Sequence, residues 1–172
     1  MTMNRKAIIF GIKSIKLSAF EKNLIKKDKP WGIILFSRNI VSIYQLKNLI
    51  DDIRKTINDK KYPILIDQEG GTVSRLNNII DFSLFSQTFF ADIYKKDRSN
   101  FFTYYKIYIN AVCEILKTVG ININTVPVLD IKRTNSHKII GTRSFSKELK
   151  TVDKIGKICI ELYSKNRIAT VN

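Results

Sequence analysis

Two places in the 172-residue chain carry charged side chains with the types and spacing of a binding site. The first is Asp67, which ends an apolar run and precedes Gln-Glu-Gly-Gly, with Arg75 eight residues further on. A carboxylate there can accept hydrogen bonds from two neighbouring sugar hydroxyls. The second is Arg143, whose planar fork of five donors suits hydroxyl and carboxylate groups. Taken alone, Asp67 and Arg75 fit a salt bridge that orders a loop equally well.

The remaining residues of chemical interest point to structure rather than to catalysis. The glycine pair at 70–71 permits backbone geometry that a Cβ would forbid, so we expect its loop to approach a ligand. His137, the only histidine, is expected to be a loop residue without a ligand role. Cys113 and Cys159 lie in amphipathic stretches, far from a second Cys or His at metal spacing. We therefore predict two reduced, buried cysteines, no metal site and no cofactor.

Composition indicates an ordinary globular domain with an unusual charge. Hydrophobic residues make up 44% of the chain and charged residues 26%, and the net charge is +15. Such a charge allows nucleic-acid binding. However, the lysines are spread along the chain without a dense basic run, and Ile and Asn are also abundant. Compositional drift is therefore the preferred explanation, and no nucleic-acid partner is expected.

Short apolar runs alternate with longer helical patterns. Capping boxes are expected at Ser18/Glu21 and at Ser42/Gln45, where side chains satisfy free backbone N–H groups at a helix start. A helix that ends at Gly120 is also expected. The predicted strands are residues 7–10, 32–36, 63–66, 121–129 and 168–171, and the predicted helical faces are 46/49/50/53/57, 105/108/109/112/116/119 and 152/155/158/159/162. The segment between the third strand and the second of these faces is expected to be looser.

Five strands separated by helices predict an α/β fold with a parallel sheet. The spacing allows a complete doubly wound domain of the flavodoxin type. It also allows the first five units of a (β/α)8 barrel. In both architectures a ligand meets the C-terminal ends of the strands, where Asp67 is expected. Periodicity does not choose between them.

Four blocks read in order resemble one known family. They are Gly-Ile-Ile-Leu-Phe-Ser-Arg-Asn at 32–39, Ile-Asp-Gln-Glu-Gly-Gly at 66–71, Pro-Val-Leu-Asp at 127–130 and Ile-Gly-Thr-Arg-Ser-Phe at 140–145. From about Gly32 to Thr170 the chain closely resembles the N-terminal barrel of bacterial β-N-acetylhexosaminidases of glycoside hydrolase family 3. The resemblance implies an incomplete TIM (β/α)8 barrel of roughly five βα units, with residues 1–172 as the N-terminal portion of the barrel domain.

The resemblance also implies a site and a reaction. Asp67, Arg75 and Arg143 match the family positions that hold N-acetylglucosamine beside the scissile bond, and Asp130 matches a supporting strand-four Asp. The reaction is hydrolysis of terminal β-linked N-acetylglucosamine, as in peptidoglycan fragment recycling. The family's Lys-His would begin where this chain has Asn172. Because its nucleophilic Asp and its His–Asp acid/base follow that point, no catalytic residue is expected within the chain.

The sequence therefore predicts a truncated glycosidase whose own activity it leaves open. Five strands leave two open edges with exposed apolar surface, so we expect the isolated chain to fold poorly or to need completion. Saccharide binding without turnover and a basic nucleic-acid-binding domain remain alternatives. The polar N-terminus and the lack of a long apolar run predict a cytoplasmic protein without a membrane partner.

Overall fold

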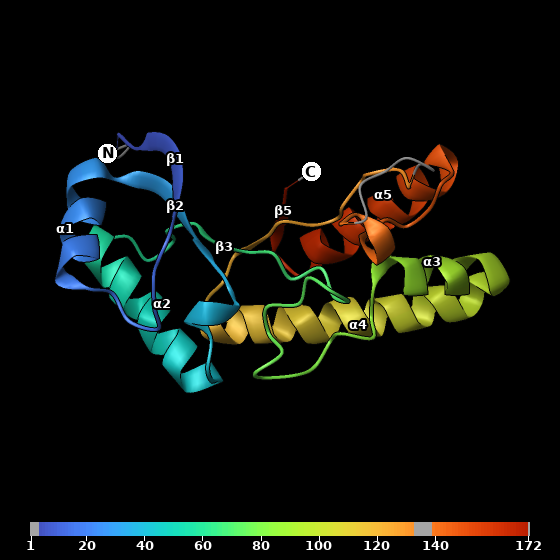
Figure 1. Ribbon diagram of the computed structural model, residues 1–172, viewed down its shortest axis with the longest axis horizontal. Coiled ribbons are helices and arrows are strands. Elements are labelled where there is room, and N and C mark those ends of the chain that lie inside the picture. Colours follow the sequence, from blue (N-terminus) through green and yellow to red (C-terminus); the bar gives the residue numbers. More distant parts are fainter. Residues whose placement is uncertain (1–3, 133–138, 172) are drawn as a thin grey trace.

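The computed structural model describes residues 4–132 and 139–171, in which strands and helices alternate (Figure 1). In chain order the elements are β1 (Lys6–Gly11), α1 (Ala19–Asp28), β2 (Pro30–Leu35), η1 (Ser37–Asn39), α2 (Ile43–Ile57), β3 (Ile64–Ile66), α3 (Gln87–Lys96), α4 (Arg98–Val119), β4 (Ile123–Asn124), η2 (Gly141–Arg143), α5 (Leu149–Lys165) and β5 (Ala169–Thr170). The η elements are single 3₁₀ turns. The predicted alternation is confirmed.

All five strands belong to one parallel sheet in the order β1-β2-β3-β4-β5. Each strand therefore lies beside its neighbour in sequence, and the winding never reverses direction. A doubly wound domain reverses its strand order at a switch point. The strand order thus excludes the flavodoxin-like alternative, and the chain folds as four βα units and a fifth strand of a (β/α)8 barrel.

The helices follow the sheet as an outer layer. α1 packs on α2, α2 on α4, and α4 on α5, while α3 packs along α4. In Figure 1 this series runs from α1 at the left, through α4 below the strands, to α5 at the right. An outer ring of helices around parallel strands is the arrangement of a (β/α)8 barrel.

Three helices show how local sequence determines the outer layer. α1 begins with the predicted capping box, because the Ser18 hydroxyl accepts the Glu21 N–H and the Glu21 carboxylate accepts the Ser18 N–H. α2 buries every position of its predicted apolar face: Leu46, Leu49, Ile50, Ile53 and Ile57. α4 ends as predicted, at Gly120 in the left-handed conformation.

The second predicted capping box is only half formed. The Ser42 hydroxyl accepts the N–H of Gln45. The Gln45 side chain, however, accepts from the N–H of Val41 and donates to the carbonyls of Ile15 and Asn39. Glutamine has both a donor and an acceptor, and here the donor ties α2 to the loop after β1.

The predicted fourth strand was too long. Residues 121–129 were expected to be extended and paired, but β4 covers only Ile123–Asn124. Backbone pairing ends with the Thr125 N–H, which donates to Ile66. Pro127, joined to Val126 by a cis peptide bond, has no N–H with which to continue the ladder. Asp130 therefore lies in irregular chain beyond the strand, not at its end.

A helix was also missed in the segment predicted to be looser. α3 begins after Ser86, whose hydroxyl accepts the N–H of Phe89. Its buried positions are Gln87, Phe90, Ala91 and Tyr94. These follow the i, i+3, i+4, i+7 spacing of an amphipathic helix, inside a run of aromatic residues that hides it.

The central strands are more buried than the first one. All residues of β3 and β4 are buried, whereas Ile8 and Ile9 of β1 are 45% and 44% exposed and Trp31 of β2 is 42% exposed. The predicted apolar exposure at the β1 edge is confirmed. No helix within the described ranges is long and apolar enough to cross a membrane.

Asn124 replaces backbone pairing where β4 ends. Its side chain is fully buried, accepts the Gln68 N–H at 2.9 Å and donates to the Gln68 carbonyl at 3.0 Å and the Tyr163 hydroxyl at 3.0 Å. Asn124→Ala should lower the free energy of unfolding by roughly 3 kcal/mol, because it leaves buried polar groups unsatisfied. Urea unfolding measures this. Asn48→Ala, on the exposed face of α2, is the control and should change stability by only about 0.5 kcal/mol.

Both cysteines are free and buried, as predicted, and burial raises the pKa of the Cys113 and Cys159 thiols to about 12. The folded chain therefore holds their protons more tightly than the unfolded chain, and their stabilising contribution is lost as pH rises from about 9 towards 12. Between pH 8 and pH 10 the free energy of unfolding should fall by about 1 kcal/mol per thiol. Urea unfolding of the wild type and of a Cys113→Ala/Cys159→Ala variant, whose pH dependence should be flatter, tests this. Equal slopes would contradict it.

Candidate functional site

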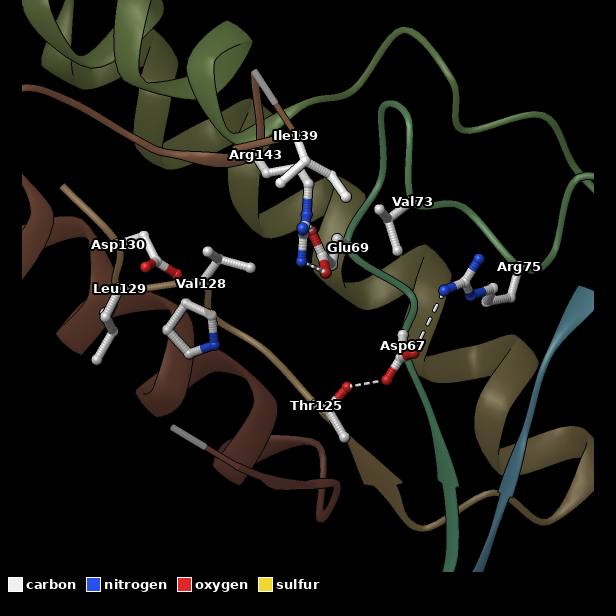
Figure 2. A pocket seen from close by; sticks show the side chains of 11 residues that line it. Asp67, Glu69, Val73, Arg75, Thr125, Val128, Leu129, Asp130, Ile139 and Arg143 are labelled. Atoms are coloured by element: carbon white, nitrogen blue, oxygen red, sulfur yellow. Dashed lines mark hydrogen bonds and ion pairs between the residues drawn. The ribbon is translucent and has the colours of Figure 1, made fainter. Parts of the chain in front are cut away.

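A cavity of about 720 Å³ lies where the chain leaves the C-terminal ends of β3 and β4. This volume is in the usual range for small-molecule sites, roughly 300–1,000 Å³. Figure 2 shows charged side chains from three segments pointing into it. The lining residues are Asp67, Glu69, Val73, Arg75, Thr125, Pro127, Val128, Leu129, Asp130, Ile139 and Arg143.

Asp67 follows β3 directly and is held from two sides. The Thr125 hydroxyl donates to its Oδ1, and Arg75 Nη2 donates to its Oδ2 at 3.3 Å. Both partners lie on the cavity wall, and the Asp67 side chain stays 23% exposed. Each carboxylate oxygen has a further lone pair available, so Asp67 can still accept hydrogen bonds from a ligand.

Glu69 and Arg143 form the second charged pair. Arg143 donates from Nε and Nη2 to the two carboxylate oxygens of Glu69, both at 2.8 Å. This is the bidentate geometry that gives arginine–carboxylate pairs their strength. The hydrogen bonds to Glu69 raise the pKa of Arg143, so its guanidinium stays charged. The Glu69 side chain is only 4% exposed, against 24% for Arg143.

The loop that runs from Asp67 to Leu76 is held together by hydrogen bonds to the side chain of Gln68. Its Oε1 accepts the N–H groups of Arg75 and Leu76 at 2.8 and 3.0 Å, and its Nε2 donates to Ser74 at 3.1 Å. Gln68 is buried, while the residues on either side of it line the cavity. The alternation of an extended chain thus presents Asp67 and Glu69 to the same space.

The glycine pair lets its loop pack closely against another segment of the chain. Gly70 and Gly71 have φ angles of +85° and +64°, a conformation that favours glycine. A Cβ on Gly70 would lie 2.2 Å from the Phe85 carbonyl oxygen, and one on Gly71 would lie 2.7 Å from Ser86. The close approach is therefore to the chain's own 85–86 segment, and it turns the loop back over α4.

The structure brings together all three residues proposed from the sequence. Asp67, Arg75 and Arg143 line one cavity, although Arg143 is 76 positions after Asp67 in sequence. Asp130, expected to support the site from behind, is an exposed residue of the cavity wall. His137 lies outside the described residues.

Sequence reasoning missed Glu69 and Thr125. The sequence did contain a signal for Glu69. It stands two residues after Asp67, and side chains at i and i+2 of an extended segment face the same side. No local sequence pattern indicates that Glu69 pairs with Arg143, because the two residues are 74 positions apart. Thr125 could be recognised only from the register that pairs β3 with β4. No group of three or more His, Cys, Asp or Glu side chains in the described ranges could hold a metal ion.

The chain is similar to a known protein family over almost its whole length. The family model for the glycosyl hydrolase family 3 N terminal domain matches residues 2–172. A β-hexosaminidase from Xanthomonas campestris is 28% identical over 145 residues, which cover 84% of this chain and 43% of that protein. The one from Alkalilimnicola ehrlichii is 31% identical over 140 residues, covering 80% and 39%. The chain thus spans less than half the length of these relatives.

Solved structures give the same result. Native NagZ from Neisseria gonorrhoeae superposes with a TM-score of 0.83 at 27% identity, covering 94% of this chain and 47% of that one. NagZ from the same organism in complex with N-trifluoroacetyl-D-glucosamine superposes with a TM-score of 0.81 at 26% identity, covering 94% and 48%.

The ion pair between Glu69 and Arg143 should be energetically coupled. Arg143→Met alone should lower the free energy of unfolding by about 2–3 kcal/mol, because it leaves a buried carboxylate without its partner. Adding Glu69→Gln should recover part of that loss, for a coupling energy of about 2 kcal/mol. Urea unfolding of the two single variants and the double variant measures the coupling.

The matched control is an exposed pair on α5. Lys157 and Asp153 approach to 2.9 Å, but their side chains are 74% and 50% exposed. The same cycle with Lys157→Met and Asp153→Asn should give a coupling below about 0.5 kcal/mol. Similar coupling energies for the two pairs would show that the buried position of Glu69 is unimportant.

Proposed function

The chain belongs to glycosyl hydrolase family 3, and from this premise we propose that it forms the sugar-binding part of a glycoside hydrolase that removes terminal β-linked N-acetylglucosamine. The observation that carries the proposal is the convergence of Asp67, Arg75 and Arg143 on one cavity at the C-terminal end of the sheet. In (β/α)8 barrels, active sites lie at that end. The NagZ relative with a bound N-trifluoroacetyl-D-glucosamine supports the choice of sugar.

The proposed roles follow from the donors and acceptors at the cavity wall. Asp67 presents two carboxylate oxygens about as far apart as hydroxyls on neighbouring ring carbons require, so it accepts from both. Arg75 and Arg143 keep N–H groups beyond those used by their carboxylate partners and donate them to sugar oxygens. Donors and acceptors fixed on several sides orient the ring, and orientation is a large part of glycosidase catalysis.

The part of the chain that forms this cavity is proposed to bind and orient the sugar. None of its residues matches the family's nucleophile or its acid/base. In the intact reaction two such groups act on either side of the glycosidic bond. Peptidoglycan fragments as the source of the sugar, and the cytoplasm as the compartment, belong to the same proposal.

Binding of N-acetylglucosamine tests the proposal directly. Chemical-shift titration of the 172-residue chain should show saturable binding at millimolar concentrations. Asp67→Asn and Arg143→Met should each weaken it at least tenfold, because a hydrogen bond to a charged group contributes about 1.5–3 kcal/mol. Arg75→Met should weaken it in the same direction.

Arg98→Met is the matched control, since Arg98 begins α4 and packs on the Tyr94 ring away from the cavity wall. It should leave the affinity unchanged. Wild-type affinity equal to that of Asp67→Asn would contradict the proposal. Release of chromophore from a chromogenic N-acetyl-β-glucosaminide by the same sample separates hydrolysis from binding without turnover.

A further inference from the structure

The charge of the cavity is opposite in sign to that of the whole chain. Among the lining residues that the structure describes, Asp67, Glu69 and Asp130 contribute three negative charges, and Arg75 and Arg143 contribute two positive ones. The sum of −3 and +2 is −1, whereas the chain carries +15. A strongly basic protein thus presents a slightly acidic wall at this cavity.

Each arginine on that wall is already engaged by a carboxylate. A free arginine fork binds carboxylate and phosphate groups strongly, because its parallel N–H groups match two anionic oxygens. In Arg143 the Nε and Nη2 groups that form this fork both donate to Glu69. In Arg75, Nη2 donates to Asp67. The N–H groups that remain can donate to hydroxyl or amide oxygens, while the charge of each guanidinium is balanced by its carboxylate partner.

Glu69 is fixed independently of Arg143. Its N–H donates to the Val73 carbonyl at 3.0 Å, and its carbonyl accepts from the buried Tyr108 hydroxyl at 3.1 Å. Its side chain is nearly inaccessible, so leaving Arg143 would place a carboxylate in a buried position without its partner. Glu69 therefore remains paired whether or not a ligand is bound, and it continues to balance the charge of Arg143.

We propose that Glu69 is a specificity-determining residue, which makes this cavity select uncharged sugars over sugars that carry a carboxylate or a phosphate. The proposal rests on the sugar-binding function given above. A neutral sugar finds acceptors on Asp67 and leftover donors on both arginines. An anionic sugar meets a wall whose described residues sum to −1 and whose two guanidinium groups each already have a carboxylate partner, so it loses hydration without gaining an uncompensated cation.

Two sugars of nearly the same size test the inference. N-acetylglucosamine and N-acetylglucosaminuronate differ only in C6, which belongs to a hydroxymethyl group in the first sugar and to a carboxylate in the second. Chemical-shift titration gives both dissociation constants, and their ratio is the quantity of interest. The wild-type chain should favour the neutral sugar at least tenfold. Glu69→Gln should reduce this ratio by about tenfold, because removing one carboxylate several ångströms away weakens repulsion of the anion and frees the Arg143 fork.

Glu114→Gln is the matched control for net charge. It makes the same substitution on the exposed face of α4, where the Glu114 side chain is 68% exposed and pairs with Lys117. The ratio should not change in this variant. Asp130→Asn removes an exposed carboxylate of the cavity wall and should reduce the ratio by about threefold, since solvent screens an exposed charge more. Asp130→Asn is the variant to measure if circular dichroism shows that Glu69→Gln does not fold.

The outcomes separate the two proposals. If the wild type binds N-acetylglucosamine but neither Glu69→Gln nor Asp130→Asn changes the ratio, the specificity role is overturned and sugar binding stands. An equal loss of affinity for both sugars in Glu69→Gln likewise overturns it, because Glu69 would then only hold the loop. If the wild type binds neither sugar, the proposed function fails and the specificity role fails with it.

Discussion

The site depends on one side chain that substitutes for backbone pairing. At the last residue of β4, the side-chain amide of Asn124 takes the place of a peptide group and satisfies both backbone polar groups of Gln68. Gln68 is thereby held facing the interior. Because side chains alternate along an extended chain, its neighbours Asp67 and Glu69 must face the cavity. A buried asparagine that does not touch the cavity thus orients both carboxylates of the proposed site.

The two carboxylates then determine what the arginines can do. From its net charge of +15 alone, one would expect the chain to bind anions through its guanidinium groups. The geometry removes that option locally, since Arg75 and Arg143 each approach a carboxylate attached to the same loop. Net charge therefore describes the surface of this protein but not its cavity. Among the residues that the structure describes, no lysine lines the cavity.

Much of the fold could be predicted from the sequence, because it depends on local patterns. The apolar face of α2, the cap of α1 and the Gly120 terminus each reflect residues a few positions apart. The length of β4 could not be predicted so easily, since the apolar residues after Asn124 resemble a strand although Pro127 cannot pair. α3 was hidden because its helical spacing begins within an aromatic run. Among the site residues, Asp67, Arg75 and Arg143 came from motif resemblance. The Glu69 pairing needed the fold to bring positions 69 and 143 together.

The loop that carries the two carboxylates also packs on α4 and its aromatic neighbours, and this packing affects how a ligand would bind. The Tyr108 ring of α4 packs against Phe82, Phe85 and Phe90 at centroid distances of 5.6, 5.8 and 4.9 Å. Its hydroxyl donates to the Glu69 carbonyl, and the backbone of Gly70 packs so closely against Phe85 that a Cβ would not fit between them. A ligand would therefore meet carboxylates that are already in position. The ordering of a mobile loop, which costs binding free energy elsewhere, has been accomplished here during folding by contacts with the helical layer.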